Sequence, residues 1–105
     1  MGTRRRPVPK LLAKKLLRIR QHLGIGQLEM YRRLKDVPGG PPGGSMISRY
    51  ERGEREPNLL VLIAYADLAK IVIDPIVDDR WDMKLFEWAL SGASIEKVAK
   101  KKRNK

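Results

Sequence analysis

Residues 45–58 of the chain read SMISRYERGEREPN, and this stretch predicts a short helix with a signal at each end. Ser45 is a residue type that caps helix N-termini through its side-chain oxygen. Gly53 can adopt the left-handed conformation that ends a helix, and Pro57 follows where another helix opens. The predicted helix, residues 45–52, is about two turns long, too short to be stable alone in water. We therefore expect a scaffold to hold it in place.

The two sides of this predicted helix differ in chemistry. Ile47 and Tyr50 form an apolar stripe at helical spacing, which suits contact with a core. Ser48 and Arg49 fall between them and would lie on the opposite, exposed side. Hydroxyl and guanidinium groups both hydrogen-bond to DNA base edges. The stretch thus predicts a helix that is presented to a partner, and we expect that partner to be double-stranded DNA.

Apolar residues recur at helical spacing along the rest of the chain, and no strand pattern competes. We therefore expect an all-α fold. The helix expected over residues 59–69, capped by Asn58, is apolar on nearly every side, so we expect it to be central. The other helices are expected over residues 10–22 and 27–34, from 74, from 81 to the break at Ser91-Gly92, and from Ser94.

Residues 36–44 read DVPGGPPGG and interrupt the helical pattern. Seven of these nine residues are Pro or Gly, which mark turns and loops and do not continue a helix. We expect a mobile surface loop that packs no core.

The net charge of +11 is unevenly distributed. Residues 1–22 carry eight Arg or Lys and no acid, and residues 97–105 carry six and no acid. Residues 23–96 hold nine basic and twelve acidic side chains. Basic ends can serve solubility alone, but basic ends that flank a presented helix favour a nucleic-acid partner.

The residue types required for catalysis are scarce. The chain has no Cys and a single His22, which we place in the last turn of the first helix. The glycines of residues 36–44 are not followed by a phosphate-binding motif. Four acidic residues could bind a hard cation, but they lack calcium-loop spacing, and we interpret them as a solvated helix flank: Asp74, Asp78, Asp79 and Asp82. We expect no enzyme, no cofactor and no metal.

Targeting and membrane signals are missing from the sequence. The charged start of the chain is followed by Lys10 and Lys14 rather than by an apolar run. No segment approaches the length of an apolar membrane span. We expect a cytoplasmic protein with no membrane partner.

Two stretches resemble the Cro/C1-type (XRE) helix-turn-helix family of transcriptional regulators: LGIGQLEMYRRL at 23–34 and ISRYERGEREPN at 47–58. The second stretch is the more specific of the two. The resemblance covers residues 10–79 and implies a compact five-helix DNA-binding domain. Its third helix would lie in the major groove while the second crosses the backbone. Residues 1–9 would then be a basic arm, and residues 80–105 a short C-terminal helical extension with a basic tail.

The resemblance also assigns roles to single residues. A glutamate at position 51 would form a structural pair with Arg20, and Gln27 would contact a phosphate through its side chain or its amide. Arg49 is the strongest candidate for specificity, because its fork matches the O6 and N7 acceptors of guanine. The resemblance implies that four side chains face the bases: Ser45, Met46, Ser48 and Arg49. Phosphate contacts suit five further arginines: Arg52 and Arg55 after the helix, and Arg4, Arg5 and Arg6 on the arm.

Two features depart from the family pattern. The connection over residues 36–44 is much longer than the usual turn between the second and third helices. Tyr31 stands where the family usually has a small residue at the contact between these helices. Together they bear on the angle at which the third helix would dock.

The leading hypothesis is a sequence-specific DNA-binding transcriptional regulator, in particular a repressor that acts as a homodimer. Trp81, Leu85 and Trp88 form an aromatic ridge that would either supply the dimer surface or pack onto the chain's own core. The alternative is an antitoxin-type interaction protein whose segment 81–105 binds a protein partner. A non-specific nucleic-acid coater is disfavoured because the basic clusters contain no interleaved aromatic residue.

Overall fold

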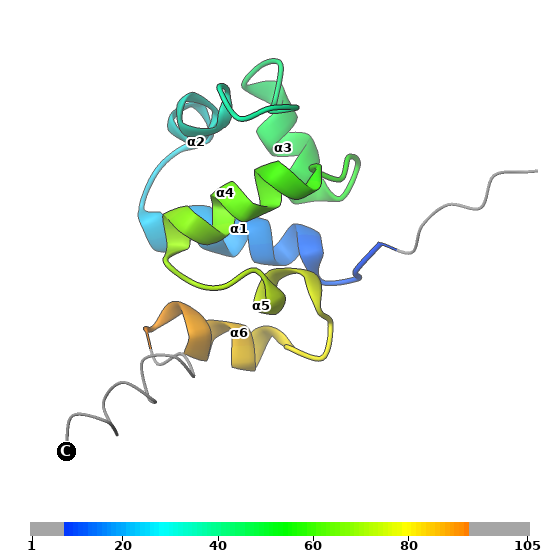
Figure 1. Ribbon diagram of the computed structural model, residues 1–105, viewed down its shortest axis with the longest axis vertical. Helices are drawn as coiled ribbons and strands as arrows, with labels where there is room; N and C mark the ends of the chain where they lie inside the picture. Colours follow the sequence, from blue (N-terminus) through cyan, green and yellow to red (C-terminus); the bar gives the residue numbers. More distant parts are fainter. Residues whose placement is uncertain (1–7, 93–105) are drawn as a thin grey trace, which may run out of the picture.

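A computed structural model describes residues 8–92 of the chain, and within this range it consists of six α-helices with no β-strand (Figure 1). The predicted all-α class is therefore confirmed. The bounds of the second, third and fourth helices agree with the sequence prediction, and the first begins two residues later than expected. The helices are α1 (Leu12–Leu23), α2 (Gln27–Leu34), α3 (Ser45–Arg52), α4 (Leu59–Ala69), α5 (Asp74–Val77) and α6 (Met83–Leu90).

α1 is the helix around which the others are arranged. Its Leu16 and Ile19 are fully buried, and it contacts α3, α4, α5 and α6. In Figure 1, α2 and α3 lie on one side of α1 and α4, whereas α5 and α6 lie on the other. The fold therefore presents α3 and α6 at opposite ends of one core.

The residues that cap α3 and α4 agree only partly with the prediction. Gly53 ends α3 in the left-handed conformation, with φ of 76°, and the Asn58 side chain caps α4 by accepting from the Val61 amide at 2.9 Å. The prediction that Ser45 caps α3 is wrong: Gly44 is the N-cap residue, and Ser45 is the first residue of the helix. The Ser45 hydroxyl is consequently not used as a cap.

The segment 36–44 packs more closely than the sequence suggests. Pro41 is buried, and the Asn58 side chain donates to the carbonyl oxygens of Pro38 and Gly39, both at 3.3 Å. A side chain at position 40 would place its Cβ 2.4 Å from the Leu34 carbonyl oxygen, so only glycine fits there. The expectation of a loop without packed residues is wrong, because the loop is held against the end of α2 and the start of α4.

α4 is apolar on nearly every side, as expected, but it is not buried on every side. Val61 and Tyr65 are fully buried. Leu59, Leu60 and Ile63 are exposed, so one side of this helix faces solvent. The expected central position of α4 therefore holds for one side of the helix only.

α6 belongs to the same core as the preceding helices. Phe86 is fully buried and Leu90 nearly so, and both are part of the core cluster that contains Leu16. The Arg18 side chain of α1 binds Glu87 with an Nε–Oε2 distance of 2.5 Å. The core therefore continues past residue 79, where the sequence interpretation placed the start of an extension. The further helix expected from Ser94, with the basic tail, lies outside the described residues.

Three residues of the predicted acidic flank have structural partners. Asp79 accepts from the backbone amides of Lys10 and Leu11, at 2.8 and 3.1 Å, just before α1 begins. These bonds keep the pKa of Asp79 below its usual range. Asp82 caps α6, and Asp78 pairs with Arg80 at 2.7 Å. The flank is therefore largely solvated, as interpreted, but three of its four residues also have structural partners.

No group of three or more His, Cys, Asp or Glu side chains among residues 8–92 is arranged to hold a metal ion. In the same part of the chain, no helix has the length and apolar character needed to cross a lipid bilayer. Between residues 8 and 92 the longest helix is α1, with 12 residues.

Candidate nucleic-acid interface

α3 has a buried side and a polar side. Ile47 is fully buried and Tyr50 nearly so, which fixes the helix to the core. The other side is a stripe at positions i, i+3, i+4 and i+7 along the helix. Its members are Ser45, Ser48, Arg49 and Arg52, and we call them the polar stripe.

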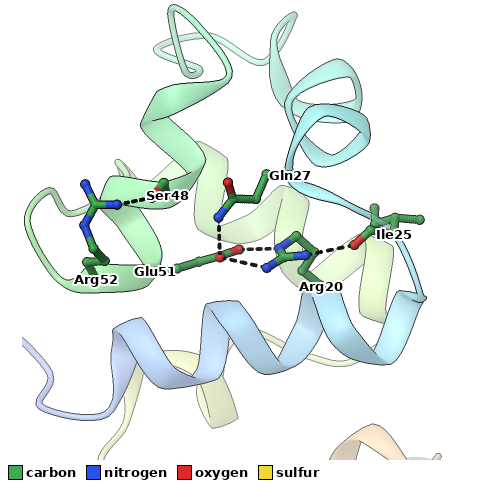
Figure 2. A network of polar contacts seen from close by, with 6 residues as sticks. All are labelled: Arg20, Ile25, Gln27, Ser48, Glu51 and Arg52. Carbon is green, nitrogen blue, oxygen red and sulfur yellow. Dashed lines mark hydrogen bonds and ion pairs between the residues drawn. The ribbon is translucent and has the colours of Figure 1, made fainter.

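Beneath α3, an ion pair fixes the helix to α1 (Figure 2). The Arg20 guanidinium donates to both carboxylate oxygens of Glu51, with distances of 2.6 and 3.0 Å. A third bond, of 3.0 Å, runs from Arg20 to the carbonyl oxygen of Ile25. The side chains of Arg20 and Glu51 are only 18% and 5% exposed. The structural pair that the resemblance implies is therefore present, and its bidentate geometry fixes how α3 lies on α1.

Gln27 joins this network from the start of α2. Its side-chain amide donates to Glu51 at 3.1 Å, as Figure 2 shows. The N-cap residue Gly26 provides no side-chain cap, so the first backbone amides of α2 lack a capping acceptor. A helix N-terminus of this kind attracts anions. Of the two contacts expected for Gln27, the backbone amide is the better placed, because the side chain already binds Glu51.

Met46 and Tyr31 differ from the polar stripe in their surroundings. Both are half-buried and pack against the hydrophobic core. Met46 therefore lies next to the stripe rather than within it, although the sequence interpretation placed it among the base-facing residues. Tyr31 contributes its ring to the core on the α2 side.

The cations around α3 have different environments. Arg49 and Arg55 are exposed, and neither side chain has a hydrogen bond or an ion pair with another described residue. Arg52 is held by Glu54 at 2.7 Å. The arm residues Arg4, Arg5 and Arg6 lie outside the described range. Arg49 is thus the cation of the polar stripe that can bind a partner without breaking a hydrogen bond or an ion pair with another described residue.

Sequence reasoning missed two sets of charged contacts near this surface. Glu29 of α2 pairs with Arg32 and Arg33, at 3.5 and 3.2 Å. Their spacings of three and four residues on a helix could have predicted these pairs. Arg52 is the last residue of α3 and Glu54 lies beyond the helix, so helical spacing could not predict their contact.

The aromatic ridge lies on the outer side of α6. The rings of Trp81 and Trp88 stack with centroids 6.4 Å apart and planes at 28°. Leu85 is 46% exposed and Trp88 39% exposed, whereas the neighbouring Phe86 is fully buried. α6 therefore packs onto the chain's own core through Phe86 and not through Leu85 or Trp88. Leu85 and Trp88 remain an exposed apolar surface, while Trp81 is half-buried.

The polar stripe, the network under it and the start of α2 lie at the same end of the core (Figures 1 and 2). No protein-family model, curated protein or solved structure matches the chain. What this surface can do follows from its geometry: it offers hydrogen-bonding side chains on a helix whose orientation is fixed from below.

Proposed function

We propose that the protein is a sequence-specific DNA-binding regulator of the helix-turn-helix type, in which α3 enters the major groove and α2 crosses the phosphate backbone. One observation carries this proposal. The outer side of α3 consists of hydrogen-bonding side chains, while its inner side is locked to α1 by the ion pair between Arg20 and Glu51. A recognition helix needs both properties, because base contacts require exposed donors and a fixed docking angle.

The residues of the polar stripe suit different parts of this task. The exposed Arg49 guanidinium can bind the O6 and N7 atoms of one guanine. The hydroxyls of Ser45 and Ser48 can donate or accept and so discriminate less. At the start of α2, uncapped amides suit a phosphate oxygen. These contacts would fix the register of α3 without reading sequence.

Charge outside the described residues supports the same partner. Of the 23 basic residues, three lie in the arm at positions 4–6 and six at positions 97–105. Each phosphate that a cation neutralises contributes roughly −0.9 to the slope of log affinity against log salt. Deletion of residues 1–9 should flatten this slope by about two to three units and leave the sequence preference intact. An unchanged slope would show that the arm does not touch DNA.

The proposal includes a homodimer that represses transcription by occupying its site. A single short helix reads only a few base pairs, so specificity normally requires two half-sites about one helical turn apart. The ridge of Trp81, Leu85 and Trp88 does not suit this dimer, because α6 lies at the opposite end of the core from α3 and a two-fold pair joined there would turn the two recognition helices away from one duplex. This function requires neither a cofactor nor a catalytic residue.

The test is the selection of bound sites from random duplex DNA with the wild type, Arg49→Ala and the control Lys84→Ala. Lys84 is an exposed cation on α6, far from α3 along the chain. We expect a palindromic consensus in which Arg49→Ala loses one guanine-dependent position in each half-site, whereas Lys84→Ala keeps the whole consensus. If the wild type enriches no site, the proposal fails.

A second candidate is an antitoxin-type protein that binds a protein partner through segment 81–105. The exposed aromatic surface on α6 favours it, since Trp is enriched at protein interfaces. The discriminating experiment is coexpression with the product of the neighbouring reading frame. Neutralisation of a toxic product by the wild type, but not by Trp88→Arg, would support this candidate. Neutralisation by neither protein would count against it.

A further inference from the structure

Arg52 lies within the polar stripe of α3. It is the last residue of the helix, four positions after Ser48 and three after Arg49. Side chains at these spacings share one side of a helix. From the sequence alone, Arg52 is predicted to contact a phosphate. Its position in the structure is that of a residue facing the same partner surface as Arg49.

The Arg52 side chain is held along α3 by two neighbours. Its Nε and Nη2 atoms donate to the two carboxylate oxygens of Glu54, at 2.7 and 3.1 Å. Its Nη1 atom donates to the hydroxyl of Ser48, and Figure 2 shows the guanidinium turned back toward that residue. A bidentate pair fixes the plane of the guanidinium as well as its position.

The turn after α3 brings the Glu54 carboxylate to this point. Gly53 has a φ of 76°, which reverses the chain at the end of the helix. The Glu54 amide then donates to the Arg49 carbonyl oxygen at 2.9 Å. Glu54 is therefore attached to the helix end by its backbone while its side chain holds Arg52.

Counting donors shows what Arg52 can still do. A guanidinium has five N–H donors, and Glu54 and Ser48 together accept from three of them. Two donors remain, which is the number that a guanine accepts through O6 and N7. Fixing a free arginine costs side-chain rotamer entropy, and the contacts with Glu54 and Ser48 have already restricted the Arg52 side chain.

We propose that Arg52 is a second guanine-reading residue of α3 and that Glu54 is the residue that positions it. This inference rests on the proposed DNA-binding function. A carboxylate close to DNA repels phosphates regardless of sequence. If that were its whole effect, removal of Glu54 would raise the affinity for all duplexes equally. A positioning role instead predicts that removal lowers the discrimination between bases at one position.

The test uses the selected consensus duplex and duplexes in which each guanine–cytosine pair of a half-site is replaced by adenine–thymine. Affinities are measured for the wild type, Arg52→Lys, Glu54→Gln and the control Glu29→Gln, which removes another surface acid paired with arginines. At one position distinct from that of Arg49, Arg52→Lys and Glu54→Gln should each lose about tenfold in discrimination. Glu29→Gln should keep it.

The outcomes separate this inference from the proposed function. A wild type without any sequence preference overturns both. A wild type that prefers its consensus, with unaltered discrimination in Glu54→Gln, overturns the positioning role alone. An equal gain in affinity for every duplex in Glu54→Gln overturns it too, because the acid would then act only by repulsion.

Discussion

α3 and α6 are both helices of eight residues that bury one side in the same core, and each is tied to α1 by an arginine. Their outer sides differ. α3 presents hydroxyls and guanidinium groups, whereas α6 exposes Leu85 and Trp88, and the half-buried Trp81 before the helix stacks on Trp88. Because the two helices lie at opposite ends of the fold, one small core can present a polar surface and an apolar surface at the same time.

The two attachments to α1 also differ. The pair between Arg20 and Glu51 under α3 is bidentate and largely buried. The pair between Arg18 and Glu87 beside α6 is 33% and 42% exposed. Exposed pairs contribute little to stability, whereas loss of one partner from a buried pair is costly. The orientation of α3 therefore depends on its ion pair, and that of α6 on apolar packing through Phe86.

The largest effect is expected from Phe86→Ala. Removing a fully buried ring should lower the free energy of unfolding by about 3–5 kcal/mol, because it leaves a cavity between α6 and α1. Lys84→Ala, at an exposed position of the same helix outside the ridge, is the control and should stay within about 0.5 kcal/mol of the wild type. Urea unfolding followed by circular dichroism measures both. Equal losses would mean that α6 has no buried side.

The next effect is expected from Glu51→Ala, which leaves the Arg20 guanidinium without its main acceptor. We expect a loss of about 2–3 kcal/mol in the free energy of unfolding. Glu87→Ala, at the exposed pair, should cost less than about 1 kcal/mol. The same urea titrations compare the two variants. A loss in Glu87→Ala as large as that in Glu51→Ala would contradict the difference between the two attachments.

A smaller effect, on the pH dependence of stability, is expected from Lys15, a residue of α1 that is buried beside Phe86. Its Nζ donates to the Asp78 carbonyl oxygen at 3.1 Å and lies 5.6 Å from the centre of the Phe86 ring. Burial lowers the Lys15 pKa, although the nearby carboxylates of Asp79 and Asp78 oppose the shift. Between the lowered folded value and the usual value of about 10.4, the unfolded chain holds more protons, so stability rises with pH.

Lys15→Met removes this titration while keeping an unbranched side chain. As the pH rises toward the usual lysine value of about 10.4, the wild type should therefore gain stability relative to Lys15→Met in urea unfolding. A constant difference between the two proteins over this range would show that the ammonium group is not desolvated.

Local signals predicted much of the fold. The bounds of α2, α3 and α4, the cap at Asn58 and the left-handed Gly53 all follow from neighbouring residues. The sequence did not indicate that Asp79 would bind amides 68 and 69 positions earlier, or that Pro41 would be buried. Such contacts depend on which helices pack together, and the pattern of neighbouring residues in the sequence does not predict them.

In the candidate site, too, some features could be predicted from the sequence and others could not. The resemblance implied the pair between Arg20 and Glu51, and helical spacing separated Ile47 from Ser48. The contact of Glu54 with the end of α3 depends on the path of the chain after the helix, so spacing alone could not reveal it. The half-buried position of Met46 likewise follows from the packing of α3 against the core.

The most direct test of the central claim is a titration of isotope-labelled protein with a short mixed-sequence DNA duplex, followed by amide chemical shifts. Non-specific binding uses the same charged surface as specific binding, so no operator is needed. We expect the largest shifts in α3 and at the start of α2, with α6 unaffected. Shifts confined to α6, or none in α3, would contradict the assignment of α3 as the DNA-binding surface.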